Sequence, residues 1–101
     1  MATIRMHLHR EPFERMKRGD KTVEARVNDV KRQCIAIGDD IEFVLLEDAS
    51  ETLTKKVTKL NYYKNFSELY TAYEGQPDEA AMQYNTEADI DNFGVVAIEL
   101  A

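Results

Sequence analysis

The 101-residue chain is poor in cysteine and has no long hydrophobic run. A single cysteine, Cys34, excludes a disulfide framework, and with His7 and His9 it gives no zinc spacing, so we expect neither a metal nor a cofactor. No segment approaches the roughly 20 apolar residues of a membrane span, and the N-terminus lacks the basic-then-apolar design of a secretory signal. We therefore expect a cytoplasmic protein that does not contact a membrane.

Lysine and arginine are absent from Asn65 onward, so the charge is divided along the chain. Residues 1–36 carry nine Lys/Arg against five Asp/Glu, whereas residues 37–101 carry four against fourteen. The formal net charge of -6 argues against a protein that grips nucleic acid over its whole surface. An anionic ligand should meet the N-terminal third, while the acidic remainder either promotes solubility or meets a basic protein partner.

A hydrophobic content of 44% in a chain of this length is typical of one globular domain, spanning residues 1–101. Alternating apolar and polar residues predict strands, and the caps, prolines and glycines between them predict short helices. The expected strands are 3–9, 22–27, 41–45, 52–61 and 95–100. The expected helices are 11–18, 30–34, 66–75, one that opens at 77–79, and 86–92, with a hairpin turn at 48–50.

Most of these strands follow one another too closely for parallel crossovers, so we expect them to pair antiparallel. The element order therefore predicts an α+β fold, a small and mostly antiparallel β-barrel with short helices packed outside it. Phe66 begins the apolar stripe of its helix and should lie in the core with one of the tyrosines. Cys34 precedes the apolar Ile35, which predicts a buried and inert thiol.

The densest functional signal is the segment GDKTVEAR, from Gly19 to Arg26. Strand parity places Thr22, Glu24 and Arg26 on one face, with roughly 7 Å between alternate side chains. A carboxylate beside a guanidinium fixes both groups and leaves donors for a planar or anionic ligand, although the same pair can be a solvated surface pair. Lys21 joins the group only if the chain is still turning after Gly19 or carries a bulge.

This segment has the pattern G-x-K-x-x-E-x-R and resembles the hallmark motif of the ASCH domain family. The resemblance covers nearly the whole chain, because further matches follow in the order usual for that family: Pro12–Glu14, Gly38–Asp39 with Phe43, Phe66–Leu69 and Gly94–Ile98. It implies a PUA-like barrel with a cleft lined by Lys21, Glu24 and Arg26. It also implies a role in binding RNA, a nucleotide or a modified nucleoside.

Some ASCH members resemble small amidohydrolases that remove an acyl group from cytidine with Lys, Thr and Glu, which makes Lys21 and Glu24 candidate catalytic residues. The nucleophile of those members lies three residues after the lysine, where this chain has Glu24, and the nearest hydroxyl is that of Thr22. Glu68 and Glu74 are further candidate carboxylates. A nuclease, suggested for other relatives, needs paired carboxylates for a divalent cation, and Glu24 is the one obvious ligand near the motif.

Three residues outside the motif complete the prediction. His7 reaches the cleft if the polar side of its strand faces it, and Arg32 follows a turn and could contact phosphate. Tyr63 belongs to an aromatic cluster on which a base could stack. We therefore predict an RNA- or nucleotide-binding module, with an amidohydrolase as the alternative. The predicted ligand-binding residues are Lys21, Thr22, Glu24, Arg26, His7, Arg32 and Tyr63.

Overall fold

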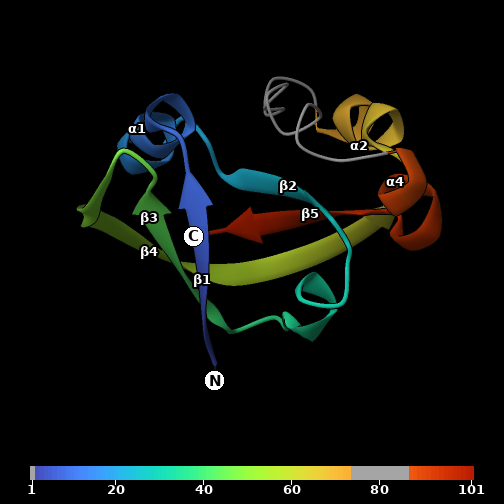
Figure 1. Cartoon of the computed structure of the whole chain (residues 1–101), viewed down its shortest axis with the longest axis horizontal. Coiled ribbons are helices and arrows are strands. Elements are labelled where there is room, and N and C mark those ends of the chain that lie inside the picture. The colour runs from blue at the N-terminus through green and yellow to red at the C-terminus, as the bar shows by residue number, and fades with distance from the viewer. Residues whose placement is uncertain (1, 74–86) are drawn as a thin grey trace.

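The computed structural model describes residues 2–73 and 87–101, which form a five-stranded sheet with three α-helices and one 3-10 helix (Figure 1). The strands are β1 (Thr3–Leu8), β2 (Val23–Val27), β3 (Asp40–Leu45), β4 (Asp48–Tyr63) and β5 (Val95–Leu100). The helices are α1 (Arg10–Arg18), the 3-10 helix η1 (Arg32–Cys34), α2 (Phe66–Ala72) and α4 (Glu87–Phe93). Within this described part of the chain, no helix combines the length and the apolar character needed to cross a membrane.

The strands lie in the order β1-β3-β4-β5-β2, and only β1 and β3 run parallel. Strand β4 has 16 residues; its first part pairs with β3 and its second part with β5. The register shifts between Val57 and Lys59, and such a bulge bends a strand and increases its twist. The sheet therefore curls into a half-barrel, and the prediction of a mostly antiparallel α+β barrel is confirmed.

The inner face of the curled sheet carries the larger hydrophobic cluster. Phe43 of β3 and Ile98 of β5 are fully buried there, and Phe13 and Met16 of α1 pack against them. Ile35, directly after η1, belongs to the same cluster. Both α1 and the segment around η1 are therefore anchored to the inner face.

The outer face of β2 and β5 is covered by α2. Val23, Ala25 and Val27 of β2 form one cluster with Phe66 and Leu69 of α2. Because β2 has apolar residues on this face at every second position, its other residues must point to the inner face. Figure 1 shows α1 and α2 above the strands and the teal η1 below them.

The prediction of a hairpin turn at residues 48–50 is wrong. Leu45 pairs with Asp48, so the loop contains only Leu46 and Glu47, and β4 begins at Asp48. Asp48 still makes the local bonds expected of a turn residue, since its Oδ1 accepts from both the amide and the hydroxyl of Ser50. A two-residue loop is the commonest hairpin connection, and here it replaces the longer turn expected from composition.

The thiol of Cys34 is exposed, which contradicts the prediction that it is buried. Only Ile35 of this short turn enters the core, because the 3-10 geometry points successive side chains in different directions. The helix expected to open at 77–79 lies outside the described residues. The helix expected at 66–75 ends earlier, at Ala72, with Tyr73 as its C-cap. The start of that second helix is confirmed: Asn65 caps it by accepting a 2.9 Å hydrogen bond from the Glu68 amide.

Candidate functional site

Lys21 lies in a turn that precedes β2, so strand parity does not decide its direction. Gly19 ends α1 with a φ of 89°, a left-handed conformation that glycine adopts without strain. The amides of Asp20 and Lys21 then both donate to the Arg15 carbonyl, so the chain is still turning at Lys21. Lys21 is only 1% exposed, and its Nζ donates a 2.8 Å hydrogen bond to the carbonyl oxygen of Val23.

The Val23 carbonyl lies on the free edge of β2. The Thr22 carbonyl accepts a hydrogen bond from the Leu100 amide of β5. The backbone N–H and C=O groups of the even-numbered residues therefore bond to β5, and those of the odd-numbered residues point away from β5. Since β1 is the other edge of the sheet, we call the space between the free edges of β1 and β2 the seam. The ammonium group of Lys21 is therefore held at the seam.

Glu24 and Arg26 lie on the inner face of β2, opposite Ile98 and Val96 of β5. Glu24 is 1% exposed, and its Oε1 is 3.6 Å from Nε of Arg26. The Nη2 group of Arg26 donates a 3.0 Å hydrogen bond to the His7 carbonyl of β1. Arg26 thus spans the seam and links the two edge strands of the half-barrel.

The buried polar atoms that lack a partner gather in this part of the molecule. Within residues 2–73 and 87–101, four buried side-chain atoms have no hydrogen-bond partner: Glu24 Oε2, Arg26 Nε, Asn28 Oδ1 and Arg32 Nε. A few such atoms per hundred residues are ordinary, but all four here fall within nine consecutive residues. An unpaired buried polar atom costs about 1–3 kcal/mol, and a ligand that pairs it recovers that cost.

Asn28 is the residue of this group that the sequence analysis did not predict. Its amide donates to the Gly94 carbonyl, which continues the β2–β5 ladder one step beyond the assigned end of β2. The parity that joins Glu24 and Arg26 therefore also includes Asn28. Extending the alternation by one more step would have found it.

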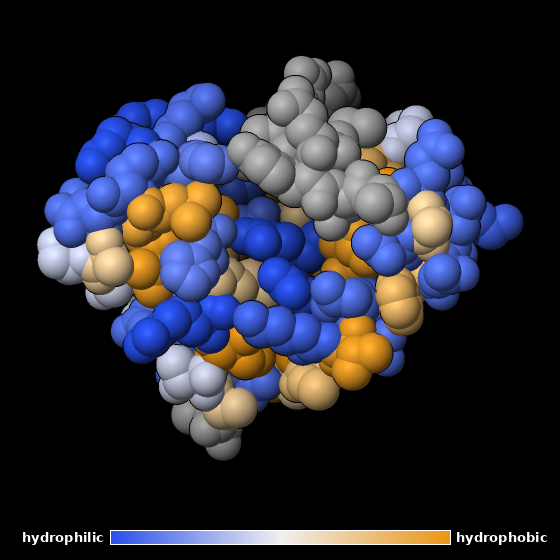
Figure 2. Space-filling model, viewed as in Figure 1, coloured by the Kyte–Doolittle hydropathy of each residue, from blue (hydrophilic) through white to orange (hydrophobic). Residues whose placement is uncertain are grey.

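The formal charges of the three motif residues sum to +1, from Lys21, Glu24 and Arg26. Both Lys21 and Glu24 are buried, and buried charges are stable only when they are paired or hydrogen-bonded. The site therefore has a small positive excess, which suits an anion with one or two charges better than a long polyanion. Figure 2 shows strongly hydrophilic residues in the middle of the face seen in Figure 1, with hydrophobic residues on both sides.

Three other candidate residues are exposed in the structure. Thr22 is exposed, and its carbonyl bonds to Leu100 of β5. His7 is also exposed, and its backbone carbonyl, not its imidazole, contacts Arg26. Glu68 is exposed at the start of α2, whereas Glu74 lies outside the described residues.

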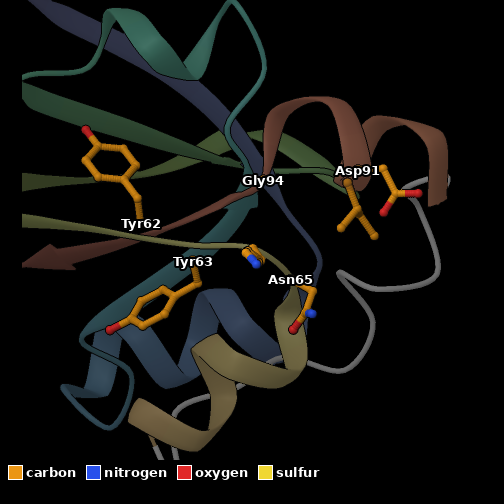
Figure 3. Close-up of a pocket in the computed structure, with 7 residues that line it drawn as sticks. Tyr62, Tyr63, Asn65, Asp91 and Gly94 are labelled. Carbon is orange, nitrogen blue, oxygen red and sulfur yellow. The ribbon is translucent and has the colours of Figure 1, made fainter.

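The two adjacent tyrosines of β4 point in opposite directions (Figure 3). Tyr63 pairs with Val95 and faces α2, where its ring makes an edge contact with Tyr73 at a centroid distance of 6.3 Å. Tyr62 pairs with Val96, which itself pairs with Arg26, so Tyr62 and Arg26 share the inner face. Tyr62 is 60% exposed, so its ring is more accessible than that of the half-buried Tyr63.

Tyr73 belongs to a hydrogen-bonded network that ties α2 to the outer face of the sheet. Its hydroxyl donates a 2.7 Å bond to Glu99 and accepts a bond from the side-chain amide of Asn61. Burial, together with the bond to Glu99, raises the pKa of Tyr73 to about 12. The hydroxyl therefore remains a donor at physiological pH, which suits a structural role.

A groove lies at the end of β4, close to both tyrosines (Figure 3). It has a volume of about 570 Å³, and it is lined by Tyr62, Tyr63, Lys64, Asn65, Ile90, Asp91 and Gly94. Its charged residues, Lys64 and Asp91, have opposite signs, so it has no net attraction for an anion. We therefore place the candidate site at the seam.

The described residues do not assemble a metal site. Within residues 2–73 and 87–101, no group of three or more His, Cys, Asp or Glu side chains could hold an ion. Glu24 faces Arg26 instead of a second carboxylate. The charged group that lies 3.6 Å from Glu24 is therefore a cation, whereas a metal-dependent nuclease requires a second carboxylate beside the first.

The fold and the charges at the seam together define a small α+β half-barrel with a polar site between its two edge strands. The model of the ASCH domain family matches residues 6–101. The chain therefore belongs to the ASCH domain family, as its G-x-K-x-x-E-x-R motif predicts.

Solved structures resemble the chain over nearly its whole length. The hypothetical protein PH0355 is 32% identical, with a TM-score of 0.81 over 99% of this chain and 97% of that protein. Protein PF0455 from Pyrococcus furiosus is 29% identical, with a TM-score of 0.72 over 97% of this chain and 94% of that one. A variant of ZmASCH from Zymomonas mobilis is 14% identical, covers 98% of this chain and 67% of its own, and with a TM-score of 0.70 shares the fold. The search of curated proteins found no match.

Proposed function

We propose that the seam binds a nucleotide, either free or as part of a short single-stranded RNA, with the edge of its base against Glu24 and Arg26. The observation that carries this proposal is the buried carboxylate of Glu24. One of its oxygens has no hydrogen-bond partner among residues 2–73 and 87–101, although the side chain is almost completely buried. A buried acceptor of this kind requires a donor, and a ligand can supply it.

Glu24 and Arg26 present an acceptor and a donor next to each other. Glu24 Oε2 can accept a hydrogen bond, and Arg26 Nε can donate one. Every nucleobase has an edge on which a donor and an acceptor are adjacent, and proteins that recognise single-stranded RNA bind such edges. The pair therefore matches a planar base edge better than a simple anion, which has acceptors only.

The charge distribution limits the size of the ligand. The chain carries a formal net charge of -6, with no basic residue from Asn65 onward. A long polyanion would meet this acidic surface, whereas a single nucleotide at the seam would contact only the basic N-terminal third. We expect a weak dependence of affinity on salt, which corresponds to one or two phosphate contacts.

Glu24→Gln tests this assignment. Glutamine keeps the shape of the side chain but replaces one acceptor oxygen by a donor, so a base donor that faces Oε2 loses its partner. We expect about a tenfold to hundredfold weaker binding, since hydrogen bonds to charged groups are worth about 1.5–3 kcal/mol. Isothermal titration with each of the four ribonucleoside monophosphates, and with a five-nucleotide RNA of mixed sequence, measures the change.

Glu87→Gln is the matched control, because Glu87 is exposed on α4 and its substitution removes the same charge. We expect this variant to bind like the original protein. Equal affinity of Glu24→Gln, Glu87→Gln and the unmodified chain would contradict the assignment of the base to Glu24.

A second candidate function is the deacylation of an N-acylated cytidine, and the burial of Lys21 favours it. Lys21 is 1% exposed and its Nζ is held by the Val23 carbonyl, so a hydroxyl or a water molecule bound beside it would meet a lysine in a fixed position, as a pair of nucleophile and base requires. This function predicts acetate release from N4-acetylcytidine, with a loss of about 100-fold or more in Lys21→Ala. Lys17→Ala, which alters an exposed lysine of α1, should retain full activity. No acetate release at high enzyme concentration would exclude this function.

A further inference from the structure

We infer that Asn28 and Arg32 form a second part of the site, which contacts the sugar and the phosphate attached to the base. The ligand is then a phosphorylated nucleotide and not a free nucleoside. This inference rests on the proposed function, and it adds the class of ligand that the site selects. It is carried by the two partnerless atoms that lie beyond the motif, Asn28 Oδ1 and Arg32 Nε.

Asn28 continues the row of inner-face residues along β2. Its amide bonds to the Gly94 carbonyl, and its own carbonyl accepts a 3.0 Å hydrogen bond from the side chain of Gln33. The backbone is therefore fixed on both sides, and the side chain follows Arg26 at a spacing of roughly 7 Å. A group bound beside Arg26 would extend toward Asn28.

The turn that contains Arg32 packs on the same face of the sheet through Ile35. Ile35, three residues later, belongs to the inner hydrophobic cluster, and its amide bonds to the Arg32 carbonyl. The Arg32 side chain is only 17% exposed, and Asp29 holds its Nη1 at 3.4 Å. Asp29 also accepts a 3.1 Å bond from the Arg32 amide, so the guanidinium is oriented before any ligand arrives.

The contact with Asp29 does not use the edge of the guanidinium that carries Nε. Arg32 Nε is buried and finds no acceptor in the described part of the chain. The edge that carries Nε can donate two parallel hydrogen bonds, and this geometry matches a phosphate or a carboxylate. In a nucleotide the phosphate provides such a group, so Arg32 would face the phosphate.

Asn28 Oδ1 requires a different partner, because it is an acceptor. A phosphate has no donor to offer at neutral pH, whereas the ribose hydroxyls do. The proposal therefore assigns the base to Glu24 and Arg26, the sugar to Asn28 and the phosphate to Arg32.

The experiment compares nucleosides with nucleotides. Each of the four ribonucleosides and its 3′- and 5′-monophosphates is titrated into the unmodified protein and into Arg32→Ala. We expect at least one monophosphate to bind about tenfold or more tightly than its nucleoside, and Arg32→Ala to remove that advantage while nucleoside affinity stays the same. Asn28→Ala should weaken nucleoside and nucleotide by similar factors.

Two further variants separate geometry from charge. Lys31→Ala removes the same charge from the adjacent, exposed residue and should leave the phosphate advantage intact. Arg32→Lys keeps the charge but lacks the Nε edge, so it should lose most of that advantage. Thermal unfolding of each variant confirms that it is folded.

The outcomes distinguish this inference from the proposed function. The phosphate contact would be overturned if Arg32→Ala and Lys31→Ala lost equal parts of the monophosphate's advantage over the nucleoside. It would also be overturned if Arg32→Lys bound the monophosphate with full affinity. If Glu24→Gln still weakens the nucleoside in that case, the base site stands without the second part. If neither nucleosides nor monophosphates bind, both proposals are wrong.

Discussion

Replacing Phe43 with alanine is expected to lower the free energy of unfolding by about 3–5 kcal/mol. Phe43 is completely buried in the centre of the inner cluster, on β3, where it lies opposite Met6 of β1 and Leu53 of β4. The truncation removes apolar surface from the core and leaves a cavity between three strands. Because a domain of this kind is stable by about 5–15 kcal/mol, the loss is a large part of the total. Equilibrium unfolding in urea measures it.

Phe93 is the control for this prediction. It lies at the end of α4 and is 38% exposed, so Phe93→Ala should cost about 1 kcal/mol. Equal effects of the two substitutions would mean that the inner cluster does not dominate the stability. Since Glu24 and Arg26 share the inner face, Phe43→Ala should also weaken nucleotide binding.

Replacing Gly94 with alanine is expected to cost about 2–5 kcal/mol, from two independent causes. Gly94 has a φ of 67°, a left-handed conformation that costs an L-residue about 1–2 kcal/mol. In addition, a Cβ atom at this position would lie 2.8 Å from the carbonyl oxygen of Tyr63, and the main chain of β4 must shift to relieve the contact, at about 1–3 kcal/mol. Figure 3 shows Gly94 close to the end of β4.

Gly38 separates these two causes. It also has a positive φ, of 95°, but an added Cβ would have no described heavy atom within 4 Å. Gly38→Ala should therefore cost only the conformational part, about 1–2 kcal/mol. A Gly94→Ala variant no less stable than Gly38→Ala would refute the predicted clash. Because the Gly94 carbonyl accepts the Asn28 amide, Gly94→Ala should also disturb the end of the proposed site.

The acidic C-terminal part of the chain leaves open a different class of function, an interaction with a basic protein. Such an interaction would use charges outside the seam and would not depend on Glu24 or Arg26. A titration of Glu24→Gln and of the unmodified chain with a basic protein therefore tests this class, which predicts equal affinity for the two.

The elements of the fold follow from local patterns. The alternation in β2 and β5, the glycine that ends α1, and the Asn65 cap of α2 are properties of neighbouring residues, and the sequence predicts each of them. The start of α1 differs from the prediction, because the helix begins at Arg10 and Pro12 is its third residue. The shared face of Glu24 and Arg26 follows from the same alternation. Periods of 2 and 3.6 residues are built into the backbone, so a short stretch of sequence is sufficient to detect them.

The placement of the tyrosines depended on the tertiary structure. Before the bulge in β4, the odd-numbered residues, such as Leu53 and Val57, lie on the inner face of the sheet. After the bulge, the even-numbered residues Leu60 and Tyr62 lie on that face. One extra residue in a strand reverses the parity of everything that follows, and nothing in the local sequence marks its position. The local sequence therefore does not tell which of the two tyrosines shares a face with Arg26, and the structure shows that it is Tyr62.

The sequence alone determined which residues of the site are charged. It also determined that two of them, Glu24 and Arg26, lie on one face of β2. Only the tertiary structure decided that this face closes on β1, that Arg26 reaches the His7 carbonyl and that Lys21 turns toward the same edge. The physical reason is that the curl of the sheet depends on pairing between strands far apart in the chain. Residues 7 and 26 are neighbours because β3, β4 and β5 carry the sheet around from one edge to the other.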